Sequence, residues 1–366
     1  MADVVPISSA PSGPVSPEGL EALRNAIEGS VPVLDLRLRS ETVGQDGFAD
    51  DAQAVTLRSR LGFQTDTAGN TALLAQASLM WPLDQRYNSS INGETRYPAI
   101  ADPENTALDR LQLRNTSLPD TVLIAGRQRV NLDDQRFIGS VDFRQNEQTF
   151  DSARIVNRSI PDVTIDLTYL DRVNRVYGTR SHAGRYTGNS YLANVALRSA
   201  DLRDSGTFWL STKVMPTRRN RSESGLRAPG HWRAGLSTTW APTPSRSRTR
   251  PTRCNSTITT TTSRSPRRWA DEFLTTPPNG LQDRYGTVAY GWKRLGFLDA
   301  LSATAVYHGF RSARLDIHYG TECDLMLLGK WRHYSAMVAY ADYSRDQFAA
   351  GTRKLWIEAD YVLNDQ

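Results

Sequence analysis

The chain has 366 residues, a formal net charge of +5 and a mean hydropathy of −0.50. No apolar run approaches the roughly 18 residues of a membrane-spanning helix, which excludes helical membrane proteins but leaves a transmembrane β-barrel open, because barrel strands alternate apolar and polar residues. The length permits two soluble domains or one large barrel, and only two cysteines exclude a disulfide framework and a CxxC metal site.

Residues 1–30 are predicted to form an N-terminal leader. A Pro/Ser/Gly-rich start is followed by a short helical patch around residues 20–27. Residues 1–14 contain neither the basic n-region nor the apolar h-region of a signal peptide.

From residue 31 onward, apolar and polar side chains alternate, which predicts strands with one apolar face. In 33–39, three leucines share one face, and an aspartate and two arginines share the other. Residues 55–63 and 110–114 repeat this pattern. Many of the later runs have roughly 9–11 residues, a length suited to tilted membrane-crossing strands. These runs are 121–130, 149–157, 163–173, 190–198, 206–214, 285–292, 302–310, 324–332, 335–343 and 354–363.

The connections between the runs are of two kinds. Some are tight turns, such as 66–70 and 118–120, and others are long polar loops, such as 82–106 and 131–148. Short turns at one end and long loops at the other are typical of outer-membrane barrels. Aromatic residues near the strand ends fit the interfacial girdles of such a barrel, although the core of a soluble β-sandwich also accounts for them.

Residues 217–268 interrupt the alternation. They contain twelve arginines and a single acid, Glu223, so the segment carries +11 and, given the total of +5, the rest of the chain carries −6. Three interpretations stay open: a shifted reading frame, a disordered extracellular loop, and an arginine-rich RNA-binding tract. A shifted frame fits the threonine run, because threonine codons read one frame away encode Tyr, His, Asp or Asn. The basic pI therefore describes this segment alone, and no nucleic-acid partner is expected.

Several stretches resemble the alginate-export family of outer-membrane porins, in particular its poorly characterised alphaproteobacterial branch. The main one reads GRQRVNLDDQRFIG at 126–139 and continues as FRQNEQTFD at 143–151. The others are YPAIADPE at 97–104, WADEFLTTP at 269–277 and KLWI at 354–357. The combined pattern is more specific than any single piece.

The resemblance implies a monomeric antiparallel barrel, eighteen-stranded in the founding member, in a bacterial outer membrane. It also implies a lumen lined by arginines and some acids that passes a polyanionic uronate polysaccharide. The expected fold is an all-β transmembrane antiparallel β-barrel of about 14–18 strands, a single domain over 31–363 that 217–268 interrupts. The expected partners are outer-membrane lipid and an anionic saccharide or a small anionic solute.

The polar faces of the predicted strands repeat arginine, and we expect these side chains to turn into the lumen. Guanidinium groups stay charged and bind carboxylates in a two-pronged manner, so a row of them offers an anionic solute many weak sites. Acids such as Asp35, Asp109 and Asp166 are expected to pair with some arginines; alternatively, the interior charges simply pair with one another. The loop 131–148 is expected to fold inward as a constriction. The expected lumen residues are Arg37, Arg39, Arg58, Arg60, Arg110, Arg114, Arg127 and Arg129, with Arg136 and Arg144 from the loop.

Enzymatic activity is not expected. The chain contains no HExxH, GxSxG, P-loop or GxGxxG motif. Its five histidines are scattered and are expected to lie in loops, so neither a metal site nor a cofactor is predicted. Two alternatives to a channel remain: a non-functional or structural barrel from a damaged gene copy, and a soluble arginine-rich nucleic-acid-binding protein. The second requires a native basic segment and predicts steep salt-dependent binding.

Overall fold

The computed structural model describes residues 17–132, 135, 138–197, 208–209, 235–236, 254–257, 269–273 and 277–364. The helix α1 (Pro17–Glu28) precedes all strands. The strands are β1 (Val31–Gln45), β2 (Ala52–Gln64), β3 (Thr71–Arg86), β4 (Asn105–Asn115), β5 (Thr121–Gln128), β6 (Thr149–Asn157), β7 (Val163–Asn174), β8 (Arg185–Leu197), β9 (Phe208–Trp209), β10 (Gly235–Leu236), β11 (Cys254–Thr257), β12 (Gln282–Leu295), β13 (Leu298–Arg311), β14 (His318–Trp331), β15 (Tyr334–Arg345) and β16 (Thr352–Leu363).

Part of the predicted leader is helical, since its residues 17–28 form α1. The interrupting segment 217–268 lies outside the described residues, apart from 235–236 and 254–257. In the part of the chain that the structure describes, no helix has the length and apolar character needed to cross a membrane.

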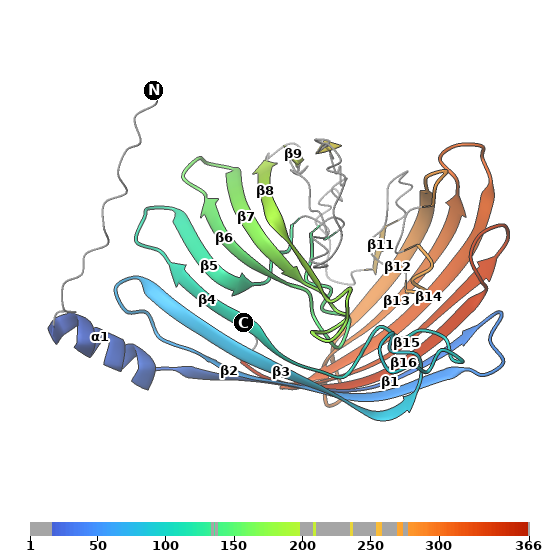
Figure 1. Ribbon diagram of the computed structural model, residues 1–366, viewed down its shortest axis with the longest axis horizontal. Helices are drawn as coiled ribbons and strands as arrows, with labels where there is room; N and C mark the ends of the chain where they lie inside the picture. Colours follow the sequence, from blue (N-terminus) through green and yellow to red (C-terminus); the bar gives the residue numbers. More distant parts are fainter. Residues whose placement is uncertain are drawn as a thin grey trace, which may run out of the picture.

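Fourteen strands form one antiparallel sheet, in the order β11 to β16 followed by β1 to β8. Strands that pair in the sheet follow each other in the chain, except that β1 pairs with β16. A closed barrel requires such a pairing between its first strand and its last strand. β9 and β10 form a separate pair. Figure 1 shows the large sheet curved into a trough whose two wings end at β8 and β11. The predicted all-β antiparallel class is confirmed.

Burial alternates along the strands because successive side chains point to opposite faces of the sheet. In β2, Thr56, Arg58 and Arg60 are buried, whereas Leu61 and Phe63 are exposed. The convex outer face thereby carries large apolar side chains from most strands. They include Leu38, Leu79, Trp81, Leu113, Ile155, Leu167, Val288, Tyr307, Leu325, Val338 and Ile357. Soluble proteins rarely expose so much apolar surface, whereas a membrane barrel turns it toward lipid.

In the described part of the chain, one end of the strands carries short turns alone, whereas the other end carries the long loops together with the short turns 46–51, 312–317 and 346–351. The short connections include 65–70, 116–120, 158–162, 296–297 and 332–333, and the long ones include 87–104, 129–148 and 175–184. In outer-membrane barrels the short turns face the periplasm. α1 lies at the short-turn end, beside the start of β1 (Figure 1).

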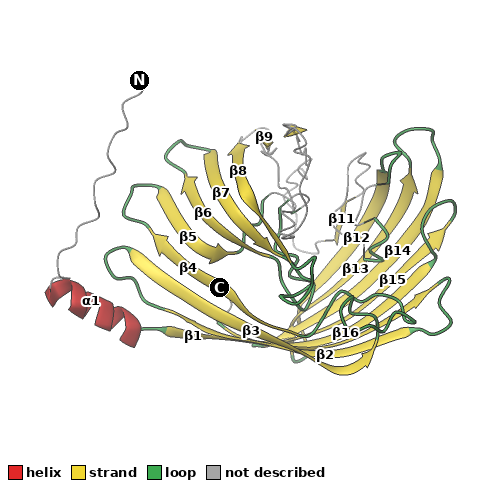
Figure 2. Cartoon of the chain, viewed as in Figure 1, coloured by secondary structure: helices red, strands yellow, loops and turns green. Residues whose placement is uncertain are grey.

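Part of the chain between the strands folds onto the concave inner face. Figure 2 shows loop segments lying across this face near β15 and β16. Phe143, from the loop after β5, packs edge-on against Trp356 of β16, with ring centroids 5.5 Å apart. Trp269 contacts the same ring at 6.4 Å, and Phe273 joins a buried aromatic cluster on the inner wall. Aromatic packing thus positions two inserted segments against the sheet.

Candidate functional site

Opposite charges face each other along the inner side of β16 and β1. Register places Arg37 opposite Asp360 and Arg39 opposite Glu358. The Nε of each arginine donates to the carboxylate of its partner at 2.7 Å. Directly opposed, oppositely charged side chains are a stabilising cross-strand arrangement. The two arginines therefore lie on the inner face, and each is held by an acid.

Asp35 and Glu147 each bind two arginines. Asp35 accepts hydrogen bonds from Arg58 Nη2 at 2.7 Å and from Arg60 Nη1 at 3.3 Å. Arg60 Nη2 also lies 3.1 Å from Glu147 Oε2, which accepts a 2.7 Å hydrogen bond from Arg129 Nε. The side chain of Glu147 is fully buried. This chain of charges joins the loop after β5 to the wall formed by β1 and β2.

The backbone and an amide side chain of the same loop also contact the wall. Arg37 Nη1 donates to the carbonyl of Asp142 at 3.0 Å, and Gln145 Nε2 donates to Thr56 Oγ1 at 2.7 Å. The described part of 131–148 therefore folds inward, as the sequence predicts, and narrows the space beside β1 and β2.

Arg144 links this loop to the second inserted segment, residues 269–273. Its guanidinium contacts Asp271 and lies 3.7 Å from Glu41 of β1. Lys354 Nζ of β16 donates to Asp271 at 2.7 Å. We call Glu41, Arg144, Asp271 and Lys354 the Arg144 junction. Two cations and two anions alternate in it and hold both segments to the wall.

Two further acids fasten the segment 269–273. Glu322 of β14 accepts hydrogen bonds from the backbone N–H groups of Trp269 and Ala270 at 2.8 and 3.1 Å. Glu272 Oε1 accepts a 2.8 Å hydrogen bond from Thr352 Oγ1 at the start of β16. The segment is therefore bound along its length.

Burial and charge act in opposite directions on the pKa values of the two inserted members of the junction. Burial alone lowers the pKa of Arg144, but attraction to Asp271 and Glu41 outweighs it, so the pKa of Arg144 is raised. Burial alone raises the pKa of Asp271, but Arg144 and Lys354 outweigh it and lower this pKa from its ordinary value of 3.8. Both groups are therefore charged at neutral pH.

The other predicted lumen arginines differ in their placement. Arg110 is buried on the inner face of β4. Arg114 is exposed and lies in an inner row with Arg154, since both are opposite Ile124. Arg136 lies outside the described residues.

Alternation in the sequence predicts that Arg127 and Arg129 share the inner face, and the structure holds the two by different acids. Arg127 Nε donates to Asp151 at 2.6 Å, and Arg127 lines a small pocket together with Asp109 and Glu147. Arg129 Nε donates to Glu147 of the inserted loop. Gly126, with φ of 115°, interrupts the alternation of β5 directly before Arg127.

A buried histidine cluster on β12–β14 was not predicted. His308 Nδ1 lies 2.9 Å from Asp283, and its Nε2 lies 3.5 Å from Asp324. The expectation that the histidines lie in loops is wrong for His308, which is fully buried in β13. Alternation along β13 places His308 on the same face as the apolar residues Val306 and Phe310. This spacing in the sequence could have predicted a buried histidine. Within the described ranges, no group of three or more His, Cys, Asp or Glu is arranged to hold a metal ion.

A pair was also missed in the β6–β7 part of the wall. Arg154 Nε lies 2.9 Å from Asp166 Oδ2, so the acid expected in the lumen binds an arginine that the sequence did not single out. Basic and acidic residues on the described inner wall are thus similar in number. The basic ones include Arg37, Arg39, Arg58, Arg60, Arg110, Arg114, Arg129, Arg144, Arg154 and Lys354, and the acidic ones include Asp35, Glu41, Asp102, Asp109, Glu147, Asp166, Asp271, Asp283, Glu322, Asp324, Glu358 and Asp360. The wall is a mixed acid–base surface.

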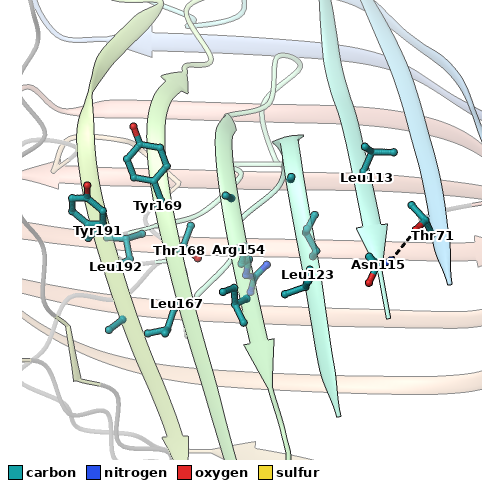
Figure 3. A pocket seen from close by; sticks show the side chains of 15 residues that line it. Thr71, Leu113, Asn115, Leu123, Arg154, Leu167, Thr168, Tyr169, Tyr191 and Leu192 are labelled. Carbon is teal, nitrogen blue, oxygen red and sulfur yellow. Dashed lines mark hydrogen bonds between the residues drawn. The ribbon is translucent and has the colours of Figure 1, made fainter. Parts of the chain in front are cut away.

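A separate apolar groove of about 760 Å³ lies across β4–β8 (Figure 3). Leu113 and the strand neighbours Tyr169 and Tyr191 belong to one register row of the outer face. The rings of the two tyrosines lie 5.4 Å apart. Most of the groove belongs to the apolar outer surface, and Arg154 of the inner wall also lines it.

No family model matches the sequence, and no curated protein matches it. Solved structures do match. OccK1 (OpdK) of Pseudomonas aeruginosa is similar with a TM-score of 0.55 and 14% identity, over 91% of this chain and 98% of that chain. OpdO of P. aeruginosa is similar with a TM-score of 0.57 and 15% identity, over 93% of this chain and 99% of that chain. OccAB3 of Acinetobacter baumannii is similar with a TM-score of 0.55 and 11% identity, over 91% of this chain and 99% of that chain.

The fold is that of an outer-membrane porin. The predicted resemblance is supported at this coarser level alone, and the similar structures are OccK1 (OpdK), OpdO and OccAB3. The predicted location in a bacterial outer membrane agrees with the fold. One of the similar structures is OpdK of P. aeruginosa with vanillate, at a TM-score of 0.56 and 14% identity over 91% of this chain and 98% of that chain.

Proposed function

We propose that this chain is an outer-membrane channel that passes anionic solutes along its charged inner face. The observation that carries the proposal is the sorting of side chains by sheet face. Arginines and acids lie on the inner face, whereas leucines, valines and aromatic residues cover the outer face. Such a sheet is stable when lipid covers one face and water the other.

The chemical group that we assign to the solute is a carboxylate. Arg37 and Arg154 remain partly accessible, at 16% and 17% of their side-chain surface, although each binds an acid, and Arg114 is exposed. A guanidinium can exchange a carboxylate of the protein for that of a solute at small net cost, because both form charge-assisted hydrogen bonds. Exchange of this kind gives the weak, repeated binding that conduction needs.

Two classes of carboxylate fit this chemistry. The sequence resemblance implies uronate oligosaccharides or polysaccharides, and OpdK was crystallised with vanillate, an aromatic carboxylate. The Arg144 junction narrows the space beside β1 and β16, because it holds two inserted segments there. We therefore favour small carboxylates and short uronates over long polymers.

Planar lipid bilayers test this proposal. The reversal potential in a KCl gradient should show anion preference, and glucuronate or vanillate should reduce the ion current. Arg37→Gln and Arg154→Gln should each weaken this block by about two- to fivefold, the effect of one partly exposed ion pair. The matched control is Arg86→Gln, because Arg86 is exposed at the end of β3 and pairs with Asp84. Cation preference, or equal block in all variants, contradicts the proposal.

A further inference from the structure

α1 carries an apolar stripe that is open to solvent. Leu20, Leu23 and Ile27 are spaced by three and four residues, so they share one face of the helix. Their exposed fractions are 55%, 51% and 56%. An adjacent polar stripe contains Arg24 and Glu28, which form an exposed ion pair at 2.7 Å. The helix is therefore amphipathic, with an apolar face that the described residues leave uncovered.

α1 is fixed to the short-turn end of the sheet. Ala26 is buried, and its carbonyl accepts a 3.0 Å hydrogen bond from the backbone N–H of Asp66 in the β2–β3 turn. At Gly29, directly after the helix, a Cβ atom would lie 2.5 Å from Asp66 Oδ2, so the carboxylate of the turn lies close against the backbone that follows the helix. These contacts set the level of α1 relative to the strands.

Along the strand direction, α1 is held at the edge of the apolar outer face of the sheet. The β2–β3 turn follows the outward-facing Leu61 and Phe63, both exposed. Pro32, four residues after the helix, is also exposed and lies opposite Phe63 in the same outer row. The apolar surface of the sheet thus runs up to the place where α1 is held. In an outer-membrane barrel this edge is periplasmic.

We propose that α1 is an interfacial helix that lies on the periplasmic surface of the lipid bilayer and inserts its apolar stripe among the acyl chains. Lipid is the occupant because the stripe continues the belt that faces lipid in the proposed channel. The polar side carries Glu18, Glu21 and Glu28 against Arg24, so the affinity comes from apolar burial and not from attraction to anionic headgroups. This inference rests on the membrane location in the proposed function.

A fluorescent probe on the full chain tests the inference. In a Cys254→Ser, Cys323→Ala background, Leu23→Cys is labelled with an NBD group and the protein is inserted into phosphatidylethanolamine–phosphatidylglycerol vesicles. The matched control is Glu21→Cys on the polar stripe. Because an interfacial helix buries its apolar face only about 5–10 Å deep, lipids brominated in the upper part of the acyl chain should quench the probe at position 23 about twofold more than the probe at 21.

Heat-modifiable migration on gels shows that the barrel has inserted, and this separates the two proposals. Equal quenching at both positions of an inserted barrel overturns the helix proposal, as does the absence of quenching at position 23. A blue-shifted but unquenched probe at 23 shows that protein covers the stripe, for example a second copy, and also overturns it. If the unlabelled parent lacks heat-modifiable migration, the membrane location fails and the helix proposal fails with it.

Discussion

Arg144 is the residue that links the two inserted segments to each other and to the wall. It lies between Asp271 and Glu41, and it is almost completely buried. Removing one partner from a buried set of charges leaves the others uncompensated, at a cost of about 3–5 kcal/mol, whereas an exposed pair contributes about 0–1 kcal/mol. A substitution at Arg144 therefore affects two segments at once.

Arg144→Gln should lower the free energy of unfolding by about 3 kcal/mol, because Asp271 then keeps Lys354 as its nearby cation and must share it with Glu41, which also has Arg39. The same variant should raise single-channel conductance, since the inserted loop loses its link to 269–273. Urea unfolding in vesicles and bilayer recordings measure the two effects. Arg96→Gln is the control, because Arg96 is exposed and pairs with Glu94 at 3.2 Å. Equal stability losses in both variants contradict the assignment.

Acid should release the segment 269–273. The pKa of Asp271 is lowered in the folded state, so its contribution to stability is complete above the ordinary value of 3.8 and is lost as the pH falls through the lower, folded value. Burial raises the pKa of Glu272, so this group binds its proton at a higher pH than Asp271. Because the pKa of Glu272 is raised in the docked state, its protonation stabilises the docked segment. Conductance should therefore stay constant from pH 7 to pH 5 and rise below pH 3.8. Asp271→Asn should conduct more at neutral pH and lack the acid step; an unchanged acid step in this variant excludes Asp271 as its origin.

Alternation along single strands was sufficient to place Arg37, Arg39, Arg58 and Arg60 on the inner face. It did not reveal their acidic partners, because these depend on register between strands far apart in the chain. The partner of Arg37 is 323 residues away, and no pattern local to either strand encodes that distance. The alternative that interior charges pair with one another describes these four residues well.

At the scale of elements, strands with a clear period of two were predicted and those without it were missed. The predicted run 163–173 matches β7, whereas β3 was not among the predicted runs. Successive apolar residues such as Leu73 and Leu74 obscure the period of β3, and Pro82 suggested a loop. In the structure, β3 continues through Arg86. The register between β2 and β3 shifts between Val55 and Thr56, which lie opposite Asp84 and Pro82.

β5 depends on a glycine at its most strained position. Gly126 has φ of 115°, and a Cβ atom there would lie 2.2 Å from the carbonyl oxygen of Leu111 on β4. Gly126→Ala should therefore lower the free energy of unfolding by about 1–3 kcal/mol, because both the backbone angle and the strand spacing oppose a side chain. Gly286→Ala in β12 is the control, since the position has no atom within 4 Å of an added Cβ. Urea titration followed by tryptophan fluorescence compares the two, and similar losses refute the steric argument.

At the scale of the whole molecule, the sequence indicates a barrel through two independent features, the alternation of strands and the separation of short turns from long loops. The fold confirms the alternation, and in the described part of the chain the long loops lie together at one end of the strands. The pairing of β1 with β16 and the docking of 269–273 inside the trough were not predictable, because they join the two ends of the chain and two distant segments. Arginine content alone also suggested a more basic inner wall than the paired surface that is present.

That paired surface predicts how the selectivity of the channel can be changed. Asp35 binds both Arg58 and Arg60, so Asp35→Asn removes one negative charge and leaves two guanidinium groups with fewer acceptors. In a confined lumen, fixed charges of one sign concentrate mobile ions of the opposite sign. Because Asp35→Asn makes the wall more positive, the anion-to-cation permeability ratio should rise about twofold or more. The control is Asp316→Asn, because Asp316 is exposed and pairs with Arg311 at 3.0 Å in the turn after β13. Reversal potentials in a KCl gradient measure both variants. If Asp35→Asn leaves the ratio unchanged or shifts it toward cations, ions do not pass along this wall.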